Sequence, residues 1–354
     1  MRKWLAAVFA AGAMHAAVIR GVVVENQTGR PLLRAVVTLK PMPGTTAETL
    51  TARTNTSGIF EFPPVPGGAY LVSAARRNFY TILYGQKDWR SAGAPVVVDQ
   101  DSSTFLSIRL PKLGVITGRV VDENDVGLPN HDVVAYRSTR PPQLSAKVTA
   151  DERGVYRFFD LVPGTYLVKT VAREYDEGSY LPTFSKDTLK VEEARPVEVL
   201  LDQEADHIDV RPTQGRLYKI AGEVHPAAMV IEGPMTGFPV TVKLTFASDM
   251  GREIAETNKT FRFPPVAPGN YDLYAEGPGD GTGRCPAVGG YLPLEIKDKD
   301  RLDIELAVPC MRDTGIQVIE RKGSPVDFAK VKLFGRRKDM AGTGEIQQLA
   351  HPGP

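Results

Sequence analysis

An internal repeat of roughly 100 residues constrains the fold of this chain more than any other feature. Similar openings recur four times, with spacings of 97, 104 and 93 residues between their marker glycines, which are Gly21, Gly118, Gly222 and Gly315. A segment of this length can hold a hydrophobic core of its own. The repeat therefore predicts a string of about four similar domains rather than one large domain.

A second block recurs inside the first three repeats. In the first repeat it runs Gly58-Ile59-Phe60-Glu61-Phe62 and then Pro66-Gly67-Gly68-Ala69-Tyr70, and equivalents begin at Gly154 and Lys259. Apolar and polar residues alternate in it, which is typical of half-buried strands. A Pro-Gly pair suits a tight turn, and the following tyrosine enters the next strand. The block therefore predicts a hairpin whose second strand carries an inward tyrosine.

Each repeat then closes with one more alternating stretch, at 105–110, 197–201 and 302–306. The count is about six or seven short strands per repeat, with no helical pattern between them. Gly 33 and Pro 28 are both abundant and recur between the apolar runs, as an all-β chain with many turns requires. We expect an all-β fold of tandem Greek-key β-sandwiches.

The N-terminus has the pattern of a signal peptide: Arg2 and Lys3, a short apolar stretch and an Ala11-Gly12-Ala13 cleavage site. The stretch is too short to span a bilayer, and no other apolar run is long enough. A buried first strand is the alternative, but 18–24 already supplies that strand. The expected boundaries are a signal peptide at 1–16, repeats at 17–111, 112–213 and 214–309, and an incomplete fourth repeat at 310–354, which matches only up to its Pro-Gly turn.

Together these motifs resemble carboxypeptidase regulatory-like domains. The resemblance rests on the Gly-Arg-Val-Val-Asp opening at 118–122, the Gly29-Arg30-Pro31-Leu32 turn and the block containing Tyr70. Tandem copies, including the segment 83–86, are similar to secreted bacterial repeat proteins of the acidobacterial type. The resemblance implies a transthyretin-like, seven-stranded β-sandwich, a fold grouped with carbohydrate-binding-like domains. It implies little about function, because the matching residues belong to turns and cores.

The sequence favours a chain that is not an enzyme. Relatives with peptidase activity carry this module beside a zinc catalytic domain, and we expect no such domain within this sequence. The five histidines stand in no zinc-binding spacing, and those of the mature repeats are expected to be solvated loop residues: His15, His131, His207, His225 and His351. No Gly-x-Ser-x-Gly elbow is present. The acidic segment 122–127 has the look of a calcium loop, but it departs from the EF-hand spacing and fits a turn. We expect no catalytic residues, no metal and no cofactor.

The sequence contains two cysteines, Cys285 and Cys310, and both would be exported with the mature protein. A disulfide between them is the natural interpretation in an oxidising compartment, where closing the loop contributes roughly 3 kcal/mol. Two free thiols are the alternative.

Four aromatic residues, Phe79, Tyr80, Tyr84 and Trp89, form the best candidate for binding. We predict a ligand site at Tyr80, Tyr84 and Trp89, because sugar-binding modules stack pyranose faces on such rings. The alternative is that these rings pack a long loop onto the edge of the sandwich. The second repeat has a looser analogue in Tyr175, Tyr180 and Phe184.

These observations predict a secreted, extracellular or periplasmic, non-catalytic protein that acts as a spacer or an adhesion-like module. A carbohydrate-binding protein using its aromatic loops is the alternative, and an accessory region of a larger exported peptidase or outer-membrane receptor is a further one. Expected partners are extracellular polysaccharide or a cell-surface protein. Nucleic acid is not expected, because the net charge is +1 and no basic stripe is present.

Overall fold

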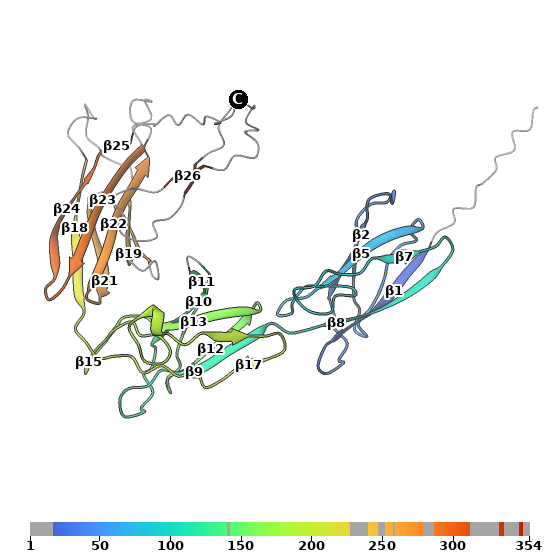
Figure 1. Cartoon of the computed structure of the whole chain (residues 1–354), viewed down its shortest axis with the longest axis horizontal. Helices are drawn as coiled ribbons and strands as arrows, with labels where there is room; N and C mark the ends of the chain where they lie inside the picture. The colour runs from blue at the N-terminus through green and yellow to red at the C-terminus, as the bar shows by residue number, and fades with distance from the viewer. Residues whose placement is uncertain are drawn as a thin grey trace, which may run out of the picture. The chain divides into compact units, whose positions relative to one another are not determined.

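The computed structural model describes residues 17–139, 142–226, 240–246, 252–257, 259–278, 287–311, 333–335 and 347–349. Within those ranges the chain is all-β apart from one turn of 3-10 helix, η1 (Val191–Glu193) (Figure 1). It divides into two compact units. The first unit comprises the described residues up to Thr117, Phe158–Gly164 and Glu198–Asp206, and the second comprises the remainder.

The first repeat forms two sheets. One has the order β4-β1-β8, in which β1 pairs with β4 antiparallel and with β8 parallel. The other has the order β3-β2-β5-β6, and β7 also pairs with β5. The bounds are β1 (Val18–Glu25), β2 (Val36–Pro41), β3 (Leu50–Arg53), β4 (Ile59–Glu61), β5 (Gly68–Ala75), β6 (Ile82–Leu83), β7 (Val96–Val98) and β8 (Ser103–Leu110).

The third repeat has the same arrangement, and its sheets have the orders β21-β18-β24 and β20-β19-β22-β23-β25. Here too the opening strand pairs with the closing strand in parallel. The bounds are β18 (Tyr218–Pro226), β19 (Val240–Phe246), β20 (Arg252–Thr257), β21 (Thr260–Val266), β22 (Gly269–Pro278), β23 (Ala287–Ile296), β24 (Arg301–Val308) and β25 (Cys310–Met311).

The second repeat contributes sheets of order β12-β9-β17 and β11-β10-β13-β16, and a small ribbon β14-β15. Its bounds are β9 (Gly114–Arg119), β10 (Asp132–Arg137), β11 (Gln143–Thr149), β12 (Val155–Leu161), β13 (Gly164–Thr170), β14 (Arg173–Tyr175), β15 (Gly178–Tyr180), β16 (Val197–Val199) and β17 (Glu204–Ala205). The stretch 197–201 was predicted to close this repeat, and that was wrong. It forms β16, beside β13, whereas β17 pairs with β9 in parallel.

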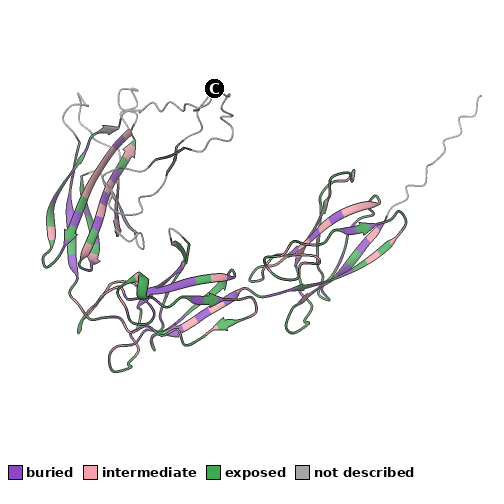
Figure 2. Ribbon diagram, viewed as in Figure 1, coloured by how far each residue is buried: buried purple, intermediate pink, exposed green. Residues whose placement is uncertain are grey.

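The tandem β-sandwich fold is therefore confirmed. Buried residues alternate with more exposed ones along strands such as β1 and β8, so their sheet turns one face to a core, whereas β10 and β13 carry continuous buried runs (Figure 2). The first core gathers 18 buried residues around Phe60, Phe62 and Tyr70, and the third gathers 18 around Phe261, Phe263 and Tyr271.

The marker glycine of the repeat is required by packing. A Cβ on Gly21 would lie 2.1 Å from the carbonyl oxygen of Leu106 and 2.8 Å from the ring of Phe60. At Gly222 the corresponding distances are 2.2 Å to the oxygen of Ile304 and 2.8 Å to Phe261. The aromatic ring that opens the second block thus lies over the glycine of the first strand. This contact explains why the two motifs recur together.

The predicted hairpin at the Pro-Gly turn is wrong. β4 pairs with β1, whereas β5 pairs with β2, so the turn at Pro66 connects the two sheets of the sandwich. The same is true of β21 and β22. Alternation along a strand specifies which residues face the core but not which strand lies alongside, and the hairpin was inferred from alternation and turn chemistry alone.

The turn before β4 uses a side chain to hold its shape. The Oδ1 atom of Asn55 accepts hydrogen bonds from the N–H groups of Ser57 and Ile59, both at 3.0 Å. Gly58 completes the turn with a φ of 72°, in the left-handed region that glycine tolerates. Asp151 and Gly154 repeat this turn in the second repeat, where φ is 75°.

The repeated tyrosine anchors the turn that precedes it. The hydroxyl of Tyr70 donates to the carbonyl oxygen of Pro66 at 2.7 Å, and Tyr271 donates to Ala267 at 2.6 Å. Both rings are buried, and burial raises the pKa of both hydroxyls. The ring fills the core and its hydroxyl satisfies a carbonyl that the turn would otherwise leave unpaired.

Several expectations lie outside the described residues. They are the signal peptide at 1–16, Cys285 and most of 310–354; Cys310 itself belongs to β25. The Cys285–Cys310 disulfide therefore stays a prediction. In the last repeat, β26 (Leu333–Gly335) pairs antiparallel with β27 (Gln347–Leu349). No helix in the part of the chain that the structure describes has the length and apolar character needed to cross a membrane.

Candidate functional site

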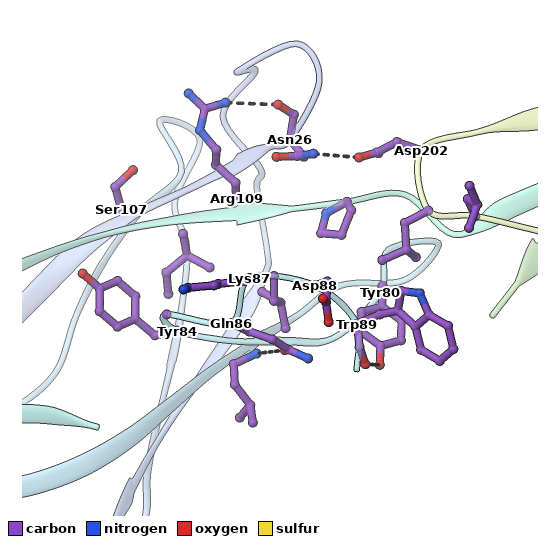
Figure 3. A pocket seen from close by; sticks show the side chains of 17 residues that line it. Asn26, Tyr80, Tyr84, Gln86, Lys87, Asp88, Trp89, Ser107, Arg109 and Asp202 are labelled. Atoms are coloured by element: carbon purple, nitrogen blue, oxygen red, sulfur yellow. Dashed lines mark hydrogen bonds between the residues drawn. The ribbon is translucent and has the colours of Figure 1, made fainter. Parts of the chain in front are cut away.

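The three predicted ligand-binding residues line one cavity of the first unit. Its volume is about 650 Å³, within the range of small-molecule sites. Tyr80, Tyr84 and Trp89 come from the segment around β6, and residues of β8 and of two turns complete the wall (Figure 3). The lining residues are Asn26, Tyr80, Ile82, Leu83, Tyr84, Gly85, Gln86, Lys87, Asp88, Trp89, Ser107, Ile108, Arg109, Pro111, Leu200, Leu201 and Asp202.

Some of the four aromatic residues around β6 pack against the core of the sandwich, and others lie outside it. Phe79 and Tyr84 are half-buried and lie against the core of the first sandwich. The N–H of Tyr84 also donates to Val72 at 2.8 Å, which fixes its backbone beside β5. These two rings therefore pack the loop onto the sandwich, as the alternative interpretation predicted. Tyr84 still reaches the cavity, whereas Phe79 does not line it.

Trp89 lines the cavity without packing into the core of the first sandwich. It is half-buried and is not part of the core cluster around Tyr70. The hydroxyl of Tyr80 lies 3.4 Å from the carbonyl oxygen of Trp89, and the guanidinium of Arg90 lies 4.5 Å from the centre of the indole ring. The guanidinium therefore lies close to the indole, whose ring quadrupole attracts the cation.

Side-chain hydrogen bonds hold the loop that carries Trp89. The Oδ1 atom of Asp88 accepts from the N–H groups of Arg90 and Ser91, both at 2.8 Å. In return the Oγ atom of Ser91 accepts from the N–H groups of Lys87 and Asp88, at 3.1 and 2.9 Å. The backbone donors from Arg90 and Ser91 lower the pKa of the Asp88 carboxyl. The loop is thus a closed turn that presents Trp89 in a defined place.

The opposite wall of the cavity is built around Asp202. Its Oδ2 atom accepts from the Nδ2 of Asn26 at 2.8 Å, and its Oδ1 atom accepts from the N–H of Lys112 at 2.7 Å. The Nη1 of Arg109 donates to the carbonyl oxygen of Asn26 at 3.1 Å. Sequence reasoning missed these wall residues. Only Arg109 could have been suspected from the sequence, because the alternation in its strand predicts that its side chain points outward.

The three aromatic residues of the second repeat do not meet in one cavity as those of the first repeat do. Tyr180 and Phe184 are buried, at 7% and 3% exposure, and the hydroxyl of Tyr175 donates to the carbonyl oxygen of Pro129 at 2.9 Å. Tyr175 and Tyr180 lie against His131, whose ring stacks on Tyr175 and meets the edge of Tyr180. Phe184 instead lines a separate cavity of about 460 Å³. Tyr175 and Tyr180 of this looser analogue therefore pack around a buried histidine.

The expectation that His131 is a solvated loop residue was wrong. Its exposure is 0%; its Nε2 atom lies 3.0 Å from the carbonyl oxygen of Val171, and its Nδ1 atom lies 3.0 Å from the hydroxyl of Tyr175. Burial lowers the pKa of His131 to about 4. His207 and His225 are exposed, as expected, but His225 belongs to β18 and not to a loop.

The acidic segment 122–127 is a turn. The Oδ1 atom of Asp122 accepts from the N–H groups of Asn124 and Val126, at 2.9 and 2.8 Å. Asp125 forms an ion pair with Arg211, and the Nε of Arg211 also donates to the carbonyl oxygen of Asp122 at 3.0 Å. The Asp122 carboxylate thus bonds to the backbone of the turn, and the Asp125 carboxylate bonds to Arg211.

Fold and cavity together define a class: a tandem array of β-sandwich modules with a ligand-sized hollow in its first unit. A family model of the carboxypeptidase regulatory-like domain matches residues 18–110 and 115–211, more than half of the chain. The chain belongs to the carboxypeptidase regulatory-like domain family.

Solved structures similar to this chain include three bacterial proteins. The Bacillus anthracis TIE protein is 15% identical with a TM-score of 0.26, covering 83% of this chain and 51% of that one. GBS52, the minor pilin of Streptococcus agalactiae, is 15% identical with a TM-score of 0.34, covering 57% and 97%. The shaft pilin SpaA of Lactobacillus rhamnosus GG is 12% identical with a TM-score of 0.33, covering 57% and 98%. The chain thus spans about half the length of the Bacillus anthracis protein. Among curated proteins, none matches it.

Proposed function

We propose that this chain is an exported, non-catalytic array of sandwich modules that acts as a spacer or adhesion-like module. One observation carries the proposal: the residues that recur from repeat to repeat are the residues that build the sandwich. Gly21, Asn55, Gly58 and Tyr70 all make contacts within their own repeat, as described above. What the repeats share is therefore architecture, and architecture is what a spacer requires.

Small-angle X-ray scattering of the full chain tests the spacer role. A compact globule of this length has a radius of gyration of about 20 Å. A spacer requires a value well above this figure, and a value near it would overturn the proposal.

Independence of the modules gives a second test. Phe60→Ala removes a ring that is 2% exposed in the first core. It should lower the hydrogen-exchange protection of β1 and β5 and leave β19 and β22 unchanged, because the third repeat has a separate core. Equal loss of protection in both regions would contradict a modular array.

Carbohydrate binding is the second candidate function, and the observation that favours it is the meeting of Tyr80, Tyr84 and Trp89 in one cavity. Aromatic rings offer flat apolar faces to pyranose rings, and the polar wall offers hydrogen bonds to hydroxyl groups. Glycan-array binding by the full chain should be lost in Tyr84→Ala and in Trp89→Ala. A blank array for the unaltered chain would sink this candidate while leaving the spacer role intact.

A further inference from the structure

The hydrogen-bonding balance of the cavity indicates the charge of its ligand. We propose that the cavity binds an acidic polysaccharide, in which pyranose units carry carboxylate groups, in preference to a neutral one. This inference rests on the second candidate function, carbohydrate binding.

The acceptors of the cavity wall are largely used by the protein. Asp88 accepts two backbone N–H groups, and both carboxylate oxygens of Asp202 accept donors from Lys112 and Asn26. The Oε1 atom of Gln86 accepts from the N–H of Leu83 at 2.9 Å. The Asp202 carboxylate, the Oδ1 atom of Asp88 and the amide oxygen of Gln86 therefore have less capacity to accept hydrogen bonds from sugar hydroxyls.

The donors, in contrast, remain open. The bond from Gln86 Oε1 to the backbone leaves its amide NH₂ group to donate, and Figure 3 shows this side chain at the edge of the cavity. Arg109 uses one N–H on the carbonyl oxygen of Asn26 and keeps the rest of its guanidinium. Neither Arg109 nor Lys87 forms an ion pair with another described residue.

A wall whose cationic donors are open and whose acceptors are mostly occupied suits a ligand rich in acceptors. A carboxylate is acceptor-only and forms charge-assisted hydrogen bonds with lysine and arginine, which are about twice as strong as neutral ones. Lys87, Arg109 and Trp89 line the same cavity, although Figure 3 shows the guanidinium of Arg109 beside Asn26 and apart from the indole. The arrangement suits a polysaccharide in which one sugar ring stacks on the indole while carboxylates elsewhere along the chain meet the cations.

Trp89 also provides a means of measurement. The chain contains two tryptophans, Trp4 and Trp89. In the full chain carrying Trp4→Phe, indole fluorescence reports Trp89 alone. Titrating polygalacturonate, and dextran as the neutral polymer, gives two dissociation constants. We expect polygalacturonate to bind at least tenfold more tightly at low salt, and its dissociation constant to rise with salt because exposed charges are screened.

Charge-removing variants locate the effect. Lys87→Gln combined with Arg109→Gln should weaken polygalacturonate binding about tenfold and leave any dextran binding unchanged. Lys40→Gln is the matched control, since this exposed lysine of β2 does not line the cavity and its loss should change neither constant. Trp89→Phe should retain binding because a flat ring remains, and fluorescence is then replaced by calorimetry.

The outcomes separate the two claims. Equal binding of both polymers, or a double variant that binds polygalacturonate normally, overturns the acidic preference but leaves carbohydrate binding standing. No binding of either polymer, together with a blank glycan array, overturns both claims. An unchanged circular dichroism spectrum for each variant establishes that the lost binding is not lost folding.

Discussion

Two aromatic segments follow equivalent strands in the first two repeats, yet they have opposite fates. After β5, Tyr80, Tyr84 and Trp89 are half-buried and line one cavity, whereas after β13, Tyr175 and Tyr180 pack around the buried His131, and Phe184 is 3% exposed. The difference lies in the polar groups nearby. In the second repeat, Pro129 and His131 supply buried partners for the hydroxyl of Tyr175. Aromatic content alone therefore does not indicate a binding loop, because a buried polar partner can draw the same residues into a core.

The largest expected effect tests the buried member of this comparison. Phe184→Ala should destabilise the second unit by about 3–5 kcal/mol, since it removes a large ring that is 3% exposed. Urea unfolding followed by hydrogen exchange of β10 and β13 measures the loss. Leu144→Ala in β11 is the control, because Leu144 is 60% exposed and its removal should cost little. If Phe184→Ala is equally mild, the two aromatic segments do not differ as described.

Acid should weaken the second unit through His131. Its pKa is about 4 in the folded chain, against about 6.5 when exposed. Between these values the unfolded chain binds a proton that the folded chain does not, so stability falls as the pH is lowered. The contribution is fully present above pH 6.5, and about 3 kcal/mol is lost once the pH passes below 4.

Urea unfolding of the full chain at several pH values between 7 and 4 measures this slope. His131→Gln should flatten the slope, whereas Leu144→Ala, a change at an exposed apolar residue, should leave it unchanged. An identical pH dependence in both variants would show that His131 does not titrate in this range.

A smaller effect is expected from Tyr175→Phe, which deletes a single hydroxyl. That hydroxyl lies 2.9 Å from the oxygen of Pro129 and 3.0 Å from the Nδ1 of His131, so its loss leaves buried polar atoms unpaired. We expect a cost of about 1–3 kcal/mol in the free energy of unfolding. The matched change in the first repeat, Tyr84→Phe, should cost less than about 0.5 kcal/mol. Equal costs would remove the contrast between the two segments.

A small effect on stability is also expected for Trp89→Ala, a change that should abolish glycan binding. Trp89→Ala should change the free energy of unfolding by less than about 1 kcal/mol, because the indole is only half-buried and lies outside the core. Thermal unfolding measures this change in the same samples used for glycan binding. A loss as large as that of Phe184→Ala would mean that Trp89 packs the sandwich and that the loop is structural.

The β-sandwich fold could be predicted from the sequence because the recurring motifs are the residues that form the strands and their contacts. Alternation in the block around Phe60 identified strands, and the recurrence of Gly21 with that block reflects a real contact. The sequence did not reveal which strands pair with one another, so the turn at Pro66 was predicted to form a hairpin. His131 was misassigned because it follows Pro129 and Asn130 in a polar turn, where nothing local indicates the buried pocket that receives it.

The candidate site was predicted in part for a similar reason. Tyr80, Tyr84 and Trp89 are neighbours in the sequence, so they could be found together. Asn26 and Asp202 are 176 residues apart and meet only through the folded arrangement of the chain. Arg109 reaches the same place because β8 runs in parallel beside β1, a pairing that alternation does not reveal.

The parallel pairing of β1 and β8 has a mechanical consequence. The two strands are in register from Val18 opposite Ser103 to Glu25 opposite Leu110. Because they run in the same direction, the chain enters the repeat at one end of this ladder and leaves it at the other. A tensile force on the two ends of the repeat therefore loads the ladder in shear, and its hydrogen bonds bear the load together rather than opening one after another.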